Sequence, residues 1–176
     1  MSIVPDVKNW TWVLERACPE CGFVTTSTDY EAVPALTRQV AVRFAVVLDR
    51  VDVRTRPDSS TWSPLEYGAH VRDVCRLFDT RLDLMLAGRR DGAIPRFPNW
   101  DQDATAVADR YGEQDPPRVA AELAEAAGRV ARSFESVPAA RRALRGERDD
   151  GAVFTVESFA KYFVHDLVHH LHDVRG

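Results

Sequence analysis

Apolar residues recur at intervals of three and four in four stretches of the chain, which is the spacing of a helix with one buried face. Each stretch is longer than a typical strand, and each is bounded by residues that start or stop helices. The four stretches are residues 29–51, 63–88, 115–137 and 155–174. The pattern therefore predicts four long helices.

The start of the second helix has the most specific signal. Ser63-Pro64-Leu65-Glu66 matches a capping box with proline at the first helical position. Gly88 follows the last apolar position of this helix and predicts its end. Asp115 before two prolines predicts the start of the third helix, and Thr155 can cap the last one.

The segments between these stretches are predicted to connect the helices. Residues 52–61 form a loop, residues 93–115 a long crossover with a short helical piece, and residues 141–151 a basic linker ending in a turn. Residues 1–30 show no sustained period and predict an irregular arm packed on the body. No alternating pattern long enough for a sheet is present. We predict an all-α four-helix bundle with a long crossover, forming a single domain over residues 1–176.

Composition narrows the classes of function. The chain has 176 residues, 45% hydrophobic and 28% charged, which is typical of a globular domain that builds its own core. A formal net charge of −4 argues against nucleic acid as a partner. No signal peptide or apolar span is recognisable, so we predict a cytoplasmic location and no membrane partner. Three cysteines, an odd number, argue against a disulfide framework.

The histidines indicate metal chemistry. His165 and His169 lie four residues apart on the last predicted helix, so their side chains can converge on one ion. His70, inside the second helix, is the only histidine outside the last helix. Neutral imidazole suits zinc, nickel, copper and iron. A third ligand must come from elsewhere in the chain, and a catalytic site would keep an open coordination position. The alternative is that the histidines form a solvated polar face, because the pair spacing is short and common.

A helical projection separates the remaining candidates. His165, His169 and His172 lie roughly opposite the apolar side of the last helix, which favours an accessible cleft over a sealed site. His172 is therefore an outer neighbour or alternative ligand. His170 falls nearer the apolar side, where packing is the simpler role. The carboxylates that could orient the ligands from outside are Asp73, Asp166 and Asp173.

Three segments carry a family resemblance. Residues 62–73, WSPLEYGAHVRD, and residues 165–170, HDLVHH, resemble the DinB-like superfamily. Residues 6–12, DVKNWTW, together with CPECG at 18–22 resemble an actinobacterial branch of it. The resemblance implies a four-helix bundle with one histidine from the second helix and two ligands four apart in the last helix. These positions carry over to His70, His165 and His169.

The same resemblance suggests an activity. The superfamily includes mycothiol-dependent enzymes such as maleylpyruvate isomerase, and bacillithiol transferases. The isomerase has Glu at the position matching His165, so the likeness favours a transferase using a low-molecular-weight thiol such as mycothiol over an isomerase. A metal-dependent hydrolase and a non-catalytic metal-binding stress-response protein are the alternatives. We also expect a small-molecule substrate and a homodimer.

Cys18 and Cys21 form a Cys-x-x-Cys turn, which would be half of a zinc ribbon or a redox pair. A second cysteine pair or a thioredoxin-like pattern is missing from the sequence. We therefore expect these cysteines to pack the arm against the body.

Overall fold

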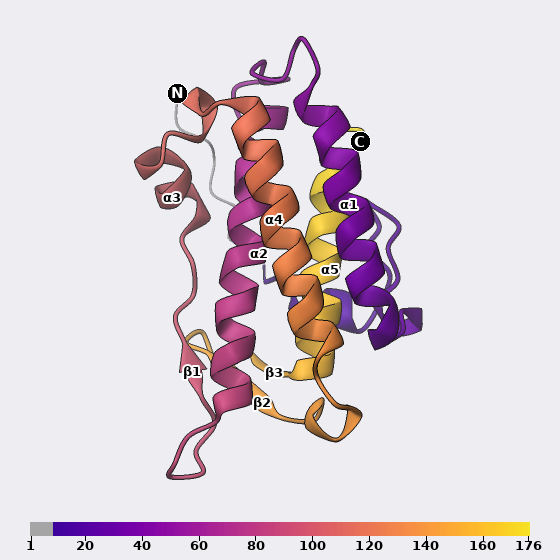
Figure 1. Cartoon of the computed structure of the whole chain (residues 1–176), viewed down its shortest axis with the longest axis vertical. Helices are drawn as coiled ribbons and strands as arrows, with labels where there is room; N and C mark the ends of the chain where they lie inside the picture. The colour runs from indigo at the N-terminus through magenta and orange to yellow at the C-terminus, as the bar shows by residue number, and fades with distance from the viewer. Residues whose placement is uncertain (1–8) are drawn as a thin grey trace.

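A computed structural model describes residues 9–176, and its main elements are four long helices (Figure 1). They are α1 (Val33–Leu48), α2 (Pro64–Ala87), α4 (Pro116–Glu135) and α5 (Val156–Asp173), with a short α3 (Gln102–Ala108) in the crossover. Helix α4 packs against α1 and α2, and α5 packs against the same two helices. The prediction of four long helices in a bundle is confirmed.

The helix termini follow the capping signals in the sequence. The Ser63 hydroxyl accepts a hydrogen bond from the Glu66 N–H, and the Glu66 carboxylate accepts one from the Ser63 N–H. Gly88 ends α2 with φ of 65°, a conformation that glycine adopts without strain. Thr155 caps α5. Helix α1 ends at Leu48, earlier than the predicted end at residue 51, and the Val51 side chain is exposed rather than part of the buried face.

Aromatic rings fill the core where α2, α4 and α5 meet. Phe163 of α5 is fully buried between Phe78 and Phe134, with ring centroids at 5.1 and 5.5 Å. Phe159 stacks on Phe78 at 4.5 Å. This packing sets the rotation of α5 about its axis and hence which of its residues face α2.

A small sheet was not predicted. It consists of β1 (Arg96–Phe97), β2 (Arg145–Arg148) and β3 (Val153–Thr155), in the order β1-β2-β3, with β1 parallel and β3 antiparallel to β2. It lies at one end of the bundle (Figure 1). Strands of two to four residues are too short to show an alternating pattern. Arg96 of β1 pairs with Glu147 of β2, far along the chain, whereas β2 and β3 are neighbours joined by residues 149–152.

The described part of the N-terminal arm runs beside α5 (Figure 1). It contains the 3₁₀ helices Trp10–Leu14, Thr25–Ser27 and Tyr30–Ala32. Residues 1–8, which carry part of the predicted arm and of its resemblance, lie outside the described residues. Among the described residues, helices long and apolar enough to cross a membrane are absent.

Candidate metal centre

Helix α5 presents two pairs of metal-ligating side chains, each with four-residue spacing. One pair is His165 and His169, and the other is Asp166 and His170. Successive residues on a helix are about 100° apart, so the two pairs lie on different faces of the same turns. The structure gives each pair a different partner.

Asp166 and His170 meet His70 of α2, and we call these three residues the bundle cluster. One ligand atom from each lies within 4.8 Å of the others. The Nε2 atoms of His70 and His170 are 3.1 Å apart, and Asp166 Oδ1 lies 3.4 Å from His170 Nε2. Two side chains from one helix and one from another therefore converge on a common point.

These distances test whether a divalent ion fits. Ligand atoms about 2.0–2.1 Å from a tetrahedral ion lie about 3.3–3.4 Å from one another. The two measured separations, 3.1 and 3.4 Å, match that geometry within a few tenths of an ångström. Two imidazoles and a carboxylate are also a ligand set that catalytic zinc sites use. The bundle cluster therefore fits a divalent ion with three protein ligands.

Aromatic rings enclose the His70 side of the bundle cluster. Trp100 stacks on His70 with an interplanar angle of 3° and a centroid distance of 5.2 Å, and Trp62 lies at the same distance. His70 is 1% exposed, whereas the Asp166 side chain is 33% exposed. Solvent therefore reaches this cluster from the Asp166 side.

The charges within the bundle cluster are strongly coupled. Burial and the neighbouring His170 lower the pKa of His70 to about 3. Burial also opposes charge on His170, but Asp166 and Asp173 outweigh it and raise the pKa of His170 to about 9. Burial raises the pKa of Asp166, and His170 more than offsets this and lowers it to about 2. Asp166 and Asp173 thus favour the protonated form of His170, whereas burial disfavours protonation of His70.

Asp173 fixes the orientation of the His170 ring. The carboxylate of Asp173 accepts a hydrogen bond from His170 Nδ1 at 3.0 Å, which leaves Nε2 directed at His70. Carboxylates commonly orient metal-binding histidines in this way from outside the ligand set.

His165 and His169 meet the arm instead, and with Cys18 and Cys21 they form what we call the arm cluster. One ligand atom from each of the four residues lies within 4.8 Å of the others. Cys18, His165 and His169 are buried, and Cys21 is partly exposed. Burial lowers the pKa of His165 to about 4 and also lowers that of His169.

The structure therefore divides the predicted triad. His70 does not form one group with His165 and His169; its partners are Asp166 and His170, one residue further along α5. His170, for which packing was the simpler role, lies beside His70 and Asp166. The accessible cleft predicted for His165 and His169 was wrong, because both side chains are buried. The projection could not resolve the two faces because it had no positions for the arm or for α2. The sequence did contain a signal for the second pair of ligands, because Asp166 and His170 have the same four-residue spacing as His165 and His169.

The other predicted residues have different neighbours. The His172 side chain is 56% exposed and belongs to neither cluster. Asp73 is paired with Arg72 and accepts a hydrogen bond from the Tyr111 hydroxyl. Sequence reasoning had grouped both with the ligands because they share a helix with them.

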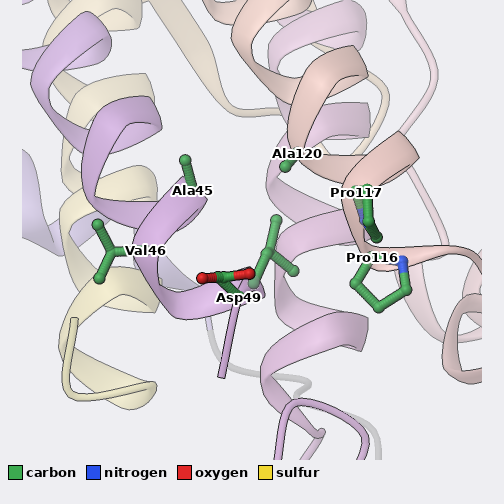
Figure 2. A pocket seen from close by; sticks show the side chains of 7 residues that line it. Ala45, Val46, Asp49, Pro116, Pro117 and Ala120 are labelled. Carbon is green, nitrogen blue, oxygen red and sulfur yellow. The ribbon is translucent and has the colours of Figure 1, made fainter. Parts of the chain in front are cut away.

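Two hollows lie outside the clusters. One, of about 340 Å³, is lined by Trp62 and Tyr111 among others, and Trp62 also contacts His70. Figure 2 shows the other, of about 380 Å³. It lies between the C-terminal end of α1, with Asp49 just beyond it, and Pro116, Pro117 and Ala120 of α4. Neither lining includes a histidine.

Comparisons with known proteins agree with this architecture. A family model described as the DinB superfamily matches residues 35–174. Among solved structures, YfiT from Bacillus subtilis is similar with a TM-score of 0.72 and 17% identity, over 83% of this chain and 84% of that chain. YfiT is described as a probable metal-dependent hydrolase with an unusual four-helix bundle topology. Comparison with curated proteins gave no match.

Proposed function

The chain belongs to the DinB superfamily, and from that premise we propose that it is a metal-dependent enzyme whose ion is held by His70, Asp166 and His170. The observation that carries the proposal is that three ligand atoms from two helices lie within 4.8 Å of one another. Two of their separations, 3.1 and 3.4 Å, are those of tetrahedral ligands. A solvated polar face would not bury a histidine at 1% exposure beside another imidazole.

When bound, a divalent ion supplies Lewis-acid chemistry at this position, making a coordinated water or thiol acidic enough to serve as a nucleophile near neutral pH. The protein orients the ligands and leaves one side of the cluster open for a substrate to approach. Asp173 holds the His170 ring, and Trp62 and Trp100 cover His70. The partly exposed Asp166 leaves one side of the cluster open to a small molecule.

Hydrolysis is the reaction we favour. Three protein ligands with one accessible side are the arrangement of catalytic rather than structural zinc sites. The description of YfiT as a probable metal-dependent hydrolase supports the same reaction class. We therefore propose hydrolysis of a small-molecule substrate.

Transfer to a low-molecular-weight thiol such as mycothiol is the second candidate, and Asp166 favours it. Maleylpyruvate isomerase, a member of the superfamily that the sequence resembles, has a glutamate at the ligand position that corresponds to His165. The ligand set that we propose would also contain a carboxylate, that of Asp166. With a carboxylate among its ligands, the site would be more like that of the isomerase than three histidines would be.

The test compares the metal-loaded parent with His170→Ala and with His172→Ala, whose exposed side chain is outside both clusters. Each protein is assayed against a panel of esters and amides, and against electrophiles with and without mycothiol. We expect turnover by the parent and by His172→Ala, and its loss in His170→Ala. Thiol-independent turnover supports the hydrolase, and turnover only with mycothiol supports the transferase. A metal-loaded parent inactive in both panels would favour the non-catalytic alternative.

Zinc or nickel as the ion, a cytoplasmic location, a homodimer and the exclusion of nucleic acid remain predictions.

A further inference from the structure

The arm cluster joins two halves of a metal-binding pattern that are far apart in the sequence. Cys18 and Cys21 supply two thiols from one turn, and His165 and His169 supply two imidazoles from one helical face. We infer that these four residues form a second metal site, a closed zinc site that fastens the N-terminal arm to α5. The proposal is independent of any activity at the bundle cluster.

The cysteine turn is built to present both thiols together. The Cys18 N–H donates to the Phe23 carbonyl at 2.9 Å, and the Gly22 N–H donates to the Cys18 carbonyl at 2.9 Å. Gly22 has φ of 73°, which a side chain would strain. Two cysteines separated by two residues and two histidines separated by three are ligand spacings of structural zinc sites.

The separation between the Cys18 and His169 ligand atoms fits a tetrahedral ion. A sulfur about 2.3 Å and a nitrogen about 2.0–2.1 Å from zinc lie about 3.5–3.6 Å apart at the tetrahedral angle. The Cys18 Sγ and His169 Nδ1 atoms are 3.6 Å apart. A weak thiol hydrogen bond would explain this one contact, but it would not explain why four ligand atoms lie within 4.8 Å.

His165 provides an independent indication. Its Nε2 atom is buried and has no hydrogen-bond partner among the described residues. An imidazole nitrogen buried in this way is unfavourable, because it has lost its contact with water without replacement. Coordination through the ring would offset that loss.

The surroundings of the arm cluster resemble the second layer of a metal site. Glu20, from the same turn as the cysteines, places a carboxylate oxygen 3.5 Å from His169 Nε2, on the opposite side of the ring from Cys18. Trp10 packs edge-on against His169 at 4.9 Å, and Phe23 lies 6.4 Å from His165. These rings limit access of water.

The two clusters therefore differ in kind. The arm cluster offers four protein ligands in an enclosed position, as structural zinc sites do, whereas the bundle cluster offers three with an accessible side. Two thiolates with two imidazoles select zinc among common divalent ions. The ion we propose would add a coordinate link between the arm and α5 to the packing of Leu14 and Phe23 against the core.

The first experiment measures zinc content and zinc X-ray absorption of the full chain, purified without a histidine tag. We expect sulfur neighbours at about 2.3 Å in the parent. Cys21→Ser should lose about one zinc per chain, whereas Cys75→Ala, which removes a buried thiol outside both clusters, should keep it. His170→Ala should keep the sulfur signal, which separates this proposal from the bundle cluster. Zinc without sulfur neighbours, or unchanged content in Cys21→Ser, would overturn the proposal.

A second measurement uses the unaltered protein, so it does not depend on a variant folding. Under reducing conditions, the reaction of its thiols with a thiol-specific reagent is followed before and after treatment with a zinc chelator. We expect the chelator to speed modification of Cys18 and Cys21 by about tenfold or more, because coordinated thiolates are protected. Equal rates with and without the chelator would contradict a zinc site.

Discussion

His70 and His170 are separated by 100 residues in sequence, yet their Nε2 atoms lie 3.1 Å apart. In this contact, a histidine of α2 meets a histidine of α5. Asp166, four residues before His170, adds a carboxylate to the same point. The candidate catalytic ion therefore depends on the rotation of α5, which the aromatic core sets.

Replacing His170 tests the ligand set. His170→Ala removes one of three ligands, and we expect affinity of the bundle cluster for its ion to fall by more than about 100-fold. Titration of the metal-depleted protein with zinc measures this change. His172→Ala, on the same helix but exposed, should bind like the parent. Equal weakening in both variants would mean that helix α5 itself had been disturbed.

Replacing Asp173 tests the orientation of the ligand. Asp173→Asn weakens the acceptor for His170 Nδ1, so we expect metal affinity at the bundle cluster to fall by about 10–100-fold with the fold intact. Circular dichroism checks the fold, and competition with a metal indicator checks the affinity. Glu157→Gln, at the other end of α5, is the matched control and should change neither. Unchanged affinity in Asp173→Asn would remove its positioning role.

The aromatic core should dominate stability. Phe163→Ala leaves a cavity between Phe78 and Phe134, so we expect the free energy of unfolding to fall by about 3–5 kcal/mol. Urea denaturation of the metal-depleted protein gives this value. Val42→Ala, at a side chain that is 68% exposed, should stay within about 0.5 kcal/mol of the parent. If the free energy of unfolding fell only slightly in Phe163→Ala, contacts other than this aromatic packing would hold α5 in place.

Asp73 should make part of the stability depend on pH. Burial raises its pKa, but hydrogen bonds from Arg72 and Tyr111 outweigh burial and leave the pKa below its usual value. A depressed folded-state pKa stabilises the protein above the unfolded value of about 3.9, and the contribution disappears as pH falls through the folded value.

Asp73→Asn should therefore be less stable than the parent at neutral pH, and the difference should shrink below about pH 4. Urea denaturation at a series of pH values measures both curves. A difference that stays constant across the series would assign the loss to packing rather than to charge.

Local signals in the sequence determined the helices and much of their ends. The Ser63 capping box, Gly88 and the Thr155 cap act within a few residues, and the structure has all three where the sequence predicts them. Periodicity identified the buried stripes for the same reason, since residues three and four apart share a helix face whatever packs against it. The sheet was not predicted because strands of two to four residues show no alternating pattern and because β1 pairs with a strand far along the chain.

The tertiary structure alone decided which partner each face of α5 meets. The sequence shows two pairs of potential ligands on that helix, offset by one residue, and about 100° of rotation separates them. Neither spacing nor residue type states that the Cys-x-x-Cys turn lies against His165 and His169, or that His70 faces Asp166 and His170. Those pairings follow from how the arm and α2 pack around α5, a long-range balance of buried surface that no local pattern encodes.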